Sequence, residues 1–384
     1  MAGGPMGASL PSLPLLLSWL ARTQALGSPA AALRSASFDG VTYSAAVVPA
    51  AKPGLPPLVL LPPIGVGIDR TFCSKFVEAW AEDASLASAL HAIDLVGMGD
   101  SHPKPKMSTP WGGWAEEPRT PAGWAEQVLA YVRQEVGEPC VLVGQSNLCT
   151  VALETAKLDP DAVKALVLVG PPAIEALSID KPQEAIDKVW RLVGSPIGAG
   201  LFRFARRKSF LSSFSKQNLF ADPSQVDDEY LEICRKGAAD ASSRHAVFSF
   251  VAGTWRQDYR ELLSTLALPT LIISGRDVSS RAAAGVGKPE PSKVDQTSAS
   301  RLLQWFKVWR KGDDQAAGRF DQVGRDLGVD PEAKLTDFAT AMNAANAAGC
   351  VETALLPGWN VLVYESPREL ATCIGNFVRR RFDP

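Results

Sequence analysis

The chain contains 384 residues, of which 46% are hydrophobic and 21% are charged, a balance typical of folded globular proteins rather than disordered ones. Its formal net charge of −2 gives no global reason to bind nucleic acid, and we expect no nucleic-acid partner. The six cysteines form no C-x-x-C pair and are too few for a disulfide framework, so we expect reduced thiols, no structural metal and no cofactor.

Residues 1–37 differ in composition from the rest of the chain. Before Asp39 there is no acidic residue, and the segment holds six serines, two arginines and an apolar run at 13–21. This composition is typical of an organelle transit peptide, and a disordered N-terminus is the plainer alternative; a secretory signal would need a cationic start, which is missing. No segment reaches the roughly 18–20 uninterrupted apolar residues of a membrane span, so we expect a soluble or peripheral mature protein.

From residue 38 to residue 173, apolar strand-like runs alternate with helix-like segments. This alternation is typical of a parallel sheet covered on both faces, in which ligands bind beyond the C-terminal ends of the strands. One helix start is explicit, because Thr120 can cap a helix whose first residue is Pro121. The strand-like runs, with the loops that follow them, lie at 38–48, 56–65, 89–101, 139–146 and 163–173, and the helix-like segments at 70–83, 120–136 and 147–158.

The pattern changes after residue 173. Residues 174–266 carry helical periodicity without strong strands, which predicts a helical lid. The charged stretch at about 281–348, which Gly and Pro interrupt, is too long for an ordinary connection, so we interpret it as an insertion that contains a crossover helix. The remaining predicted elements are a strand at 268–277, a last core strand at 350–360 and a closing amphipathic helix at 366–382.

The stretch VLVGQSNL, at 141–148, leads from a strand into a helix through Ser146. In a G-x-S-x-G elbow, small residues two before and two after the serine allow a sharp strand-to-helix turn that exposes the hydroxyl. Here Gly144 occupies the first position, but Leu148 occupies the second. From these residues alone, a nucleophilic serine and an ordinary polar turn residue are both open.

Together, the parallel sheet, the serine turn after its central strand, the helical excursion and the final strand with its terminal helix resemble the alpha/beta-hydrolase fold over residues 38–382. The phrase DLVGMGDS resembles that family's strand-ending D-x-x-G-x-G-x-S loop. LLPPIGVG, RQDY and LLPGWNVLVYESP resemble a subgroup found in cyanobacteria and in plant or algal plastids, which implies a chloroplast location, with the cytoplasm as the alternative. The resemblance implies an α/β fold with a mostly parallel sheet covered by helices; its core is 38–173 and 267–384, and its lid is 174–266.

The resemblance assigns catalytic roles residue by residue. Ser146 matches the nucleophile, and the N–H of Asn147 matches one donor of the oxyanion hole. The second donor comes from the loop after the strand PPLVLL, where Pro62 and Pro63 replace the usual His-Gly pair and supply no N–H. The N–H of the next residue, Ile64, can still serve.

The position of the catalytic acid matches the family pattern less well than that of the serine. The family position, three residues after the glycine that ends the penultimate strand, is Val278. Asp277, two residues after Gly275, is the candidate if the loop is one residue shorter, and Glu175 is a remote alternative. The other interpretation of Asp277 is a solvated loop aspartate.

The histidine position is the sharpest departure from the family. In the family's G-H-x-x-x-x-E-x-P context, counting back five residues from Glu365 reaches Asn360, with Trp359 in the place of the glycine. An asparagine amide cannot accept a proton at neutral pH, so Asn360 can orient a neighbour but cannot act as a general base. Without a base, a serine hydroxyl is a weak nucleophile.

The chain has only three histidines, and none follows His245. His91 begins a strand, at the end opposite the catalytic one, and we expect it to be structural. His102 follows DLVGMGDS on a loop at the catalytic end and is the better geometric candidate for a base, although a surface histidine is the plainer interpretation. His245 is expected to be a packing or surface residue of the lid.

Two further patterns concern ligands. IGVGIDR contains G-x-G after a strand, but Arg70 stands at the third glycine position, which argues against a dinucleotide loop. Residues 201–220 interleave five phenylalanines with five cations, which could rest peripherally on an anionic membrane or cover an apolar substrate. A lid that buries its aromatic side chains and solvates its cations explains the same pattern.

Two functions therefore stay open. The first is a serine hydrolase acting on an apolar carboxylic ester, such as a lipid or prenyl ester, with Ser146 as nucleophile and an atypical or incomplete triad. The second is a non-catalytic hydrolase-like protein that binds an apolar small molecule or a protein partner. The retained Ser146 favours the first, and Asn360 favours the second, because a fold alone cannot choose between them.

Overall fold

The computed structural model describes residues 31–51, 54–83, 85–86, 88–101, 117–178, 182–277, 330–343 and 350–383. Most of the predicted N-terminal segment, most of the predicted insertion and His102 lie outside these ranges. Within them, no helix is both long enough and apolar enough to cross a membrane.

The described residues form an eight-stranded sheet with the strand order β1-β2-β4-β3-β5-β6-β7-β8. Neighbouring strands from β4 through β3 to β8 pair in parallel, whereas β2 runs antiparallel to both β1 and β4. The predicted mostly parallel sheet is therefore confirmed. The strands are Ala32–Phe38 (β1), Val41–Val48 (β2), Leu58–Leu61 (β3), Leu90–Ile93 (β4), Cys140–Gln145 (β5), Val163–Val169 (β6), Thr270–Gly275 (β7) and Val351–Leu356 (β8).

The sheet begins earlier than the predicted boundary at residue 38. All seven residues of β1 pair with β2. Between the two strands, Asp39 and Gly40 both have positive φ, 49° and 73°, which is the geometry of a tight hairpin turn. Backbone pairing across this turn holds β1 in place, because Ala36 is its only buried residue.

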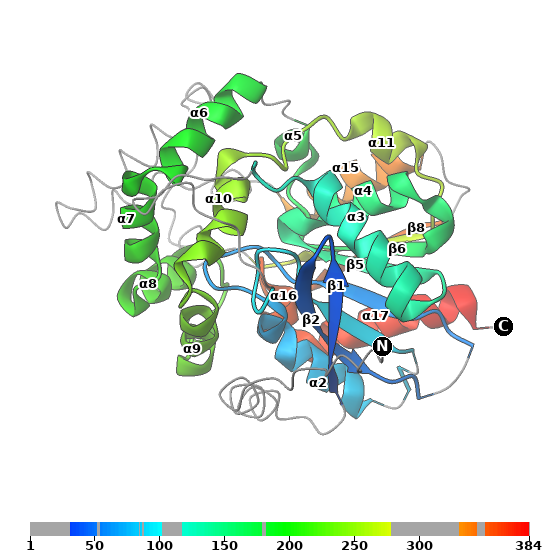
Figure 1. The fold of residues 1–384 in the computed structure, drawn as a ribbon. Helices are drawn as coiled ribbons and strands as arrows, with labels where there is room; N and C mark the ends of the chain where they lie inside the picture. The colour runs from blue at the N-terminus through cyan, green and yellow to red at the C-terminus, as the bar shows by residue number, and fades with distance from the viewer. Residues whose placement is uncertain are drawn as a thin grey trace, which may run out of the picture.

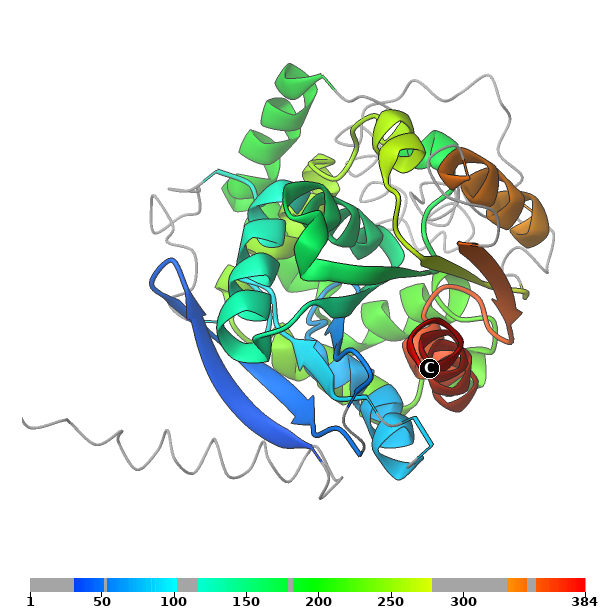
Figure 2. The ribbon, with the colours of Figure 1, turned by 90° about the vertical axis from the view of Figure 1, so that its right-hand side faces the viewer.

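The strands send alternate side chains into two separate cores. All six residues of β5 are buried; Leu142 belongs to one core, and Val141 and Val143 belong to the other. Helices α3, α4 and α15 cover the first core, and α2 and α17 cover the second, so helices flank the sheet on both sides (Figure 2). These helices are Ser74–Glu82 (α2), Pro121–Tyr131 (α3), Cys149–Leu158 (α4), Pro331–Met342 (α15) and Pro367–Phe382 (α17), and the short α16 (Leu362–Glu365) precedes α17.

Between β6 and β7 the chain forms a helical segment, α5 to α11, whose helices α6 to α10 lie together to one side of the sheet (Figure 1). Three of the five phenylalanines at 201–220 are buried in it and two are half-buried, while most of the cations are exposed. The aromatic side chains therefore mainly pack the segment. Its helices are Ile174–Leu177 (α5), Gln183–Gly194 (α6), Pro196–Ala205 (α7), Lys208–Asn218 (α8), Asp228–Gly237 (α9), Arg244–Ala252 (α10) and Arg260–Thr265 (α11).

The turn after β5 holds Ser146 in a left-handed backbone conformation. Its φ is 55°, and a non-glycine residue in this region is strained by about 1–2 kcal/mol. Gly144 permits the turn, because a Cβ at that position would lie 2.8 Å from the Cα of Cys149. The second small residue of the pattern is not required, since Leu148 fits into the core with 2% of its surface exposed.

His91 lies inside β4, one strand away from β3 on the side opposite β5. Its Nδ1 is 2.9 Å from the Tyr131 hydroxyl, and 6% of its surface is exposed. Burial, with a smaller contribution from the positive charge of Arg34, lowers the pKa of His91 from 6.5 to about 4. This environment supports the expected structural role.

Replacing Ser146 by glycine should relieve the backbone strain, because glycine populates positive φ freely. Glycine also gains entropy in the unfolded chain, which offsets part of the gain. We expect Ser146→Gly to unfold with a free energy about 0.5–1 kcal/mol higher than Ser146→Ala, as measured by urea denaturation. An alanine variant as stable as the glycine variant would contradict the strained turn.

Acidification should destabilise the protein through His91. The unfolded state binds a proton near pH 6.5 and the folded state only near pH 4, so the unfolding free energy falls as the pH drops below about 6.5. Between pH 7.5 and pH 5 the wild type should lose about 2 kcal/mol more than His91→Gln, which has no titrating group there. Equal losses in urea denaturation of the two proteins would show that the imidazole is not held neutral.

Candidate active site

Ser146 lies immediately after β5, at the C-terminal edge of the sheet. It begins a short 3-10 turn, Ser146–Leu148, that continues into α4, and its side chain is half-buried. In the described part of the chain, the Ser146 hydroxyl makes no hydrogen bond. Asn147, also half-buried, lies in the first turn of this helical run, where backbone N–H groups have no partner within the helix. A half-exposed hydroxyl without a hydrogen-bond partner among the described residues therefore lies beside an N–H group of the helix start.

The loop after β3 begins next to the serine turn. Leu61, the last residue of β3, pairs with Gly144 of β5, so Pro62 and Pro63 run alongside the residues that lead to Ser146. Both prolines are buried and Ile64 is half-buried, and among the described residues the Ile64 N–H forms no backbone hydrogen bond. Its use as the second oxyanion donor, with Asn147, stays a prediction.

The backbone of α9 packs directly against the loop that follows β3. Gly67 has a φ of 74°, and a Cβ there would lie 1.8 Å from the carbonyl oxygen of Cys234. On the helix side, a Cβ at Gly237 would lie 2.1 Å from the carbonyl oxygen of Gly67. Only glycine fits at either position, so the helical segment and the candidate oxyanion loop are in direct contact.

A buried ion pair supports the loop after β4. Asp94 accepts the backbone N–H of Arg70 at 2.8 Å and its Nη1 at 2.6 Å, and both side chains are at most 2% exposed. A Cβ at Gly99 would lie 2.6 Å from Asp94 Oδ2, and Ser101 Oγ accepts the N–H of Gly97 at 2.8 Å. The D-x-x-G-x-G-x-S spacing therefore combines a carboxylate, glycines that approach it and a hydroxyl that closes the loop.

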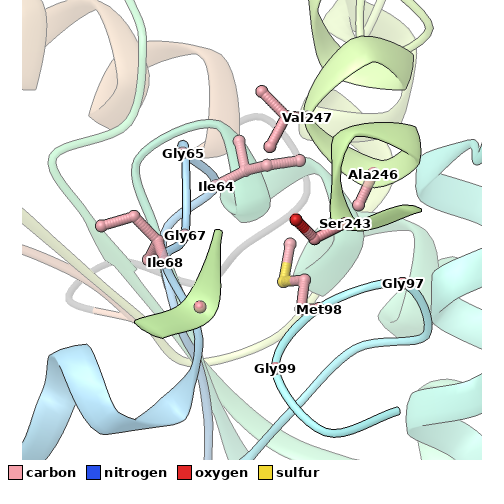
Figure 3. A pocket seen from close by; sticks show the side chains of 11 residues that line it. Ile64, Gly65, Gly67, Ile68, Gly97, Met98, Gly99, Ser243, Ala246 and Val247 are labelled. Carbon is pink, nitrogen blue, oxygen red and sulfur yellow. The ribbon is translucent and has the colours of Figure 1, made fainter. Parts of the chain in front are cut away.

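A small apolar hollow lies between these two loops and α10 (Figure 3). Ile64, Ile68 and Met98 line it from the loops, and Ala246 and Val247 line it from α10. The Ser243 side chain contributes the only hydroxyl in the lining. The free space in the hollow is roughly that of one water molecule. In this conformation the hollow is too small to hold a ligand.

Asn360 follows the edge strand β8 in the chain, but it lies next to the end of the central strand β5. The side-chain Nε2 of Gln145, the residue before Ser146, donates to the carbonyl oxygen of Asn360 at 2.8 Å. Gly170, directly after β6, lies beside this contact, and its φ of 56° favours glycine there. The loop therefore brings Asn360 to the serine turn, although no hydrogen bond joins the Asn360 and Ser146 side chains in the described part of the chain.

The two candidate acids differ in placement. Asp277 Oδ2 accepts the N–H of Gly358 at 2.7 Å, and the Asp277 N–H donates to the Gly358 carbonyl at 3.1 Å. Asp277 is exposed and supports the loop two residues before Asn360. Glu175 is an exposed residue in the first turn of α5. The structure therefore connects Asp277, through a backbone contact, to the loop that carries residue 360.

The described histidines lie apart from the hollow. His245 is fully buried in α10, where its ring packs edge-on against Trp190 with the centroids 4.9 Å apart. Its neighbours Ala246 and Val247 line the hollow, but His245 does not. His91 is held by Tyr131, and His102 lies outside the described residues.

Two carboxyl groups close to the site have raised pKa values. Burial, with the neighbouring negative charge of Asp94, raises the pKa of Asp69, whose carboxylate accepts the N–H of Thr71. Burial also raises the pKa of Glu365, while backbone N–H groups, first that of Trp359, oppose the shift. Neither the position of Gln145 nor the contacts of Glu365 followed from the sequence; the available signal was a polar residue directly before the serine, in an otherwise apolar strand.

Solved structures with this architecture come from several enzymes. An esterase from Thermogutta terrifontis is 17% identical, with a TM-score of 0.55, and the alignment covers 92% of this chain and 99% of that one. A bacterial membrane phospholipase A is 15% identical (TM-score 0.58; 96% of this chain, 92% of that one). The Cif epoxide hydrolase from Acinetobacter nosocomialis is 12% identical (TM-score 0.59; 98% and 99%). At these identities the similarity shows the fold alone, and no curated protein sequence matches the chain.

Residues 58–371 match the model of the Alpha/beta hydrolase family. The match runs from the first residue of β3 into α17, so it includes the serine turn, both loops around the hollow and residue 360. The expected alpha/beta-hydrolase fold is confirmed, and the chain belongs to the alpha/beta hydrolase family.

Proposed function

We propose that this protein is a carboxylic-ester hydrolase of low intrinsic reactivity, with Ser146 as its nucleophile. The observation that carries the proposal is the φ of 55° at Ser146, directly after the central strand. A strained non-glycine residue persists only where the surrounding structure enforces it, and such strain concentrates at functional sites. The same turn leaves the hydroxyl half-exposed and without a hydrogen-bond partner among the described residues.

The proposed reaction is acyl transfer. The Ser146 oxygen attacks the ester carbonyl, the N–H groups of Asn147 and Ile64 stabilise the resulting oxyanion, and the alcohol leaves as the acyl-enzyme forms. Water then attacks the acyl-enzyme and releases the acid. The serine proton has to leave during the first step, and the Asn360 amide cannot accept it. Solvent or His102 receives this proton in our proposal, which makes acylation slow unless His102 acts as the base.

The proposed substrate is an ester with an apolar acyl or alcohol group. Apart from Ser243, the side chains that line the hollow are apolar, which disfavours a charged substituent there. The hollow has room for roughly one water molecule, so any such substrate requires movement of α10. Contact with an anionic membrane through the exposed cations of the helical segment, and a chloroplast location, stay predictions.

Asn360 supports a second candidate function, non-catalytic binding of an apolar ligand or a protein partner. Residue 360 is brought to the serine turn by Gln145, yet its side chain cannot act as a base. A hydrolase-like binding protein needs the hollow but no proton acceptor. Lipid extraction from the purified protein, followed by mass spectrometry, would identify a retained ligand and support this alternative if the protein also fails to hydrolyse esters.

The reactivity of Ser146 should be low but specific. Loss of a catalytic triad member costs about 10⁴-fold or more in rate, while oxyanion stabilisation and binding retain about 10³-fold over water. We therefore expect a fluorophosphonate to label the protein at least about 10³-fold more slowly than an intact serine hydrolase, with all labelling lost in Ser146→Ala. The measurement is the rate of labelling, read by gel fluorescence and intact mass.

The His102→Ala variant distinguishes the outcomes of this experiment. Fast labelling of the wild type that disappears in His102→Ala would assign the base to His102. Fast labelling that survives His102→Ala and disappears in His245→Ala would assign the base to the helical segment. Labelling that persists in Ser146→Ala would contradict the proposed nucleophile.

Restoring an imidazole at residue 360 should raise the reactivity of the serine. In Asn360→His we expect labelling to increase by about 10-fold or more, with a pH dependence that follows a histidine pKa near 6.5. The increase requires an acid to orient the imidazole, so Asp277→Asn in the same background should remove most of it. No increase in Asn360→His would show that residue 360 is outside proton-transfer distance of Ser146.

A further inference from the structure

The loop at residues 357–361, which carries Asn360, is attached to the core by side chains that contact its backbone. Gln145 of β5 donates to the Asn360 carbonyl at 2.8 Å, and Asp277 accepts the Gly358 N–H at 2.7 Å. Ser366 Oγ donates to the Pro357 carbonyl at 2.6 Å. These contacts hold the loop from the central strand, from the end of β7 and from the start of α17.

Glu365 binds both this loop and the helical segment between β6 and β7. Its Oε2 accepts the N–H of Trp359 at 2.9 Å and that of Val361 at 3.4 Å, while its Oε1 accepts the N–H of Ala221 at 2.7 Å. Ala221 belongs to the helical segment, between α8 and α9, and lies 144 residues earlier in the chain. One carboxylate therefore binds two segments at once, one with each oxygen.

The carboxylate of Glu365 is neutralised by backbone N–H groups rather than by a cation. No described lysine or arginine forms a salt bridge with it, and it is half-buried. Hydrogen bonds from N–H groups to an ionised acceptor are about twice as strong as neutral ones, and an unsatisfied buried charge is costly. If the Ala221 N–H is lost, the carboxylate is therefore held less firmly for its hydrogen bonds to Trp359 and Val361, and the reverse is also true.

The residue before Glu365 makes a parallel connection. The Tyr364 hydroxyl donates to Asp227, the N-cap of α9, at 2.9 Å, and its ring stacks on Phe72 with the centroids 5.3 Å apart. Lys75 lies 3.7 Å above the same ring and 3.4 Å from Asp227. Two consecutive residues of α16 thus hold the helical segment, and one of them also holds the loop.

We propose that Glu365 is a positioning residue. It couples the packing of the helical segment at Ala221 to the position of residue 360 beside the serine turn. Movement of the segment away from Glu365 loosens the 357–361 loop, and movement of the loop loosens the segment, because such coupling is reciprocal. A ligand that enters under the helices then changes the geometry at residue 360 without touching it. The inference rests on the proposed function only in that it counts Asn360 as part of the site.

The test is amide hydrogen exchange of the full chain, read by mass spectrometry for residues 357–361, 219–223 and 140–145. The decisive variant is Ala221→Pro, which removes the N–H bound to Glu365 and leaves Trp359 and Val361 in place. We expect exchange in 357–361 to accelerate by about 10-fold or more, while 140–145 keeps its rate. Ala221→Gly keeps the N–H but loosens the segment, so it should accelerate exchange in 357–361 by a smaller factor. This variant replaces Ala221→Pro in the test if the proline variant does not fold.

Glu365→Gln should accelerate exchange in both segments, whereas Glu369→Gln, an exposed glutamate four residues later, should change neither. Unchanged exchange at 357–361 in both Ala221 variants would overturn the coupling, and so would equal acceleration in 140–145, which would indicate general loosening. In the Asn360→His background, the introduced imidazole should give one sharp ring resonance that broadens on addition of Glu365→Gln. These measurements need no turnover, so their failure is distinct from failure of the hydrolase proposal.

Discussion

The close contact between Gly144 and the first turn of α4 is the constraint on which the candidate site depends. Because no Cβ fits between Gly144 and Cys149, the chain passes from strand to helix within a few residues, and Ser146 takes a φ of 55°. The strain of about 1–2 kcal/mol is small compared with the burial of β5 and of Leu148, which fix both ends of the turn. The turn can therefore hold a serine out of the core at the edge of the sheet, where a substrate can approach.

Buried polar side chains then place the loops around this turn. Loops beyond the ends of parallel strands have no ladder hydrogen bonds of their own, so Asp94 with Arg70, Gln145 and Glu365 supply the missing contacts. Such groups are costly to bury unless they are satisfied, and for that reason they specify one loop geometry. Gln145 is only partly satisfied: its Oε1 is buried and accepts no hydrogen bond from the described residues.

The architecture and the chemistry of the site are separable in this protein. The backbone brings residue 360 to the central strand, but the side chain there is an amide without basicity. The candidate oxyanion loop, the serine turn and the apolar hollow do not depend on that side chain, because other residues hold them. Family membership alone does not decide between slow ester hydrolysis and ligand binding, because one fold can carry either function.

Local sequence determined the elements and several of their ends. Thr120 Oγ1 caps α3 by accepting the Gly123 N–H at 3.1 Å, as its position before Pro121 indicates, and the apolar runs of β3 and β5 predict strands buried on both faces. The Asp39-Gly40 pair is typical of a tight hairpin turn, and the sheet accordingly begins before the predicted boundary at residue 38, with β1.

The spacing back from Glu365 also predicts that Asn360 stands at the family's histidine position, because a motif with fixed spacing can be counted along the chain. The folded chain alone shows that this residue returns to β5, that Glu365 joins its loop to Ala221, and that His245 packs on Trp190 instead of lining the hollow. These contacts link residues far apart in the chain, and their partners are mostly backbone groups, which every residue type carries. A side chain that binds backbone N–H or C=O groups leaves no pattern in the sequence of its partner, so packing alone reveals it.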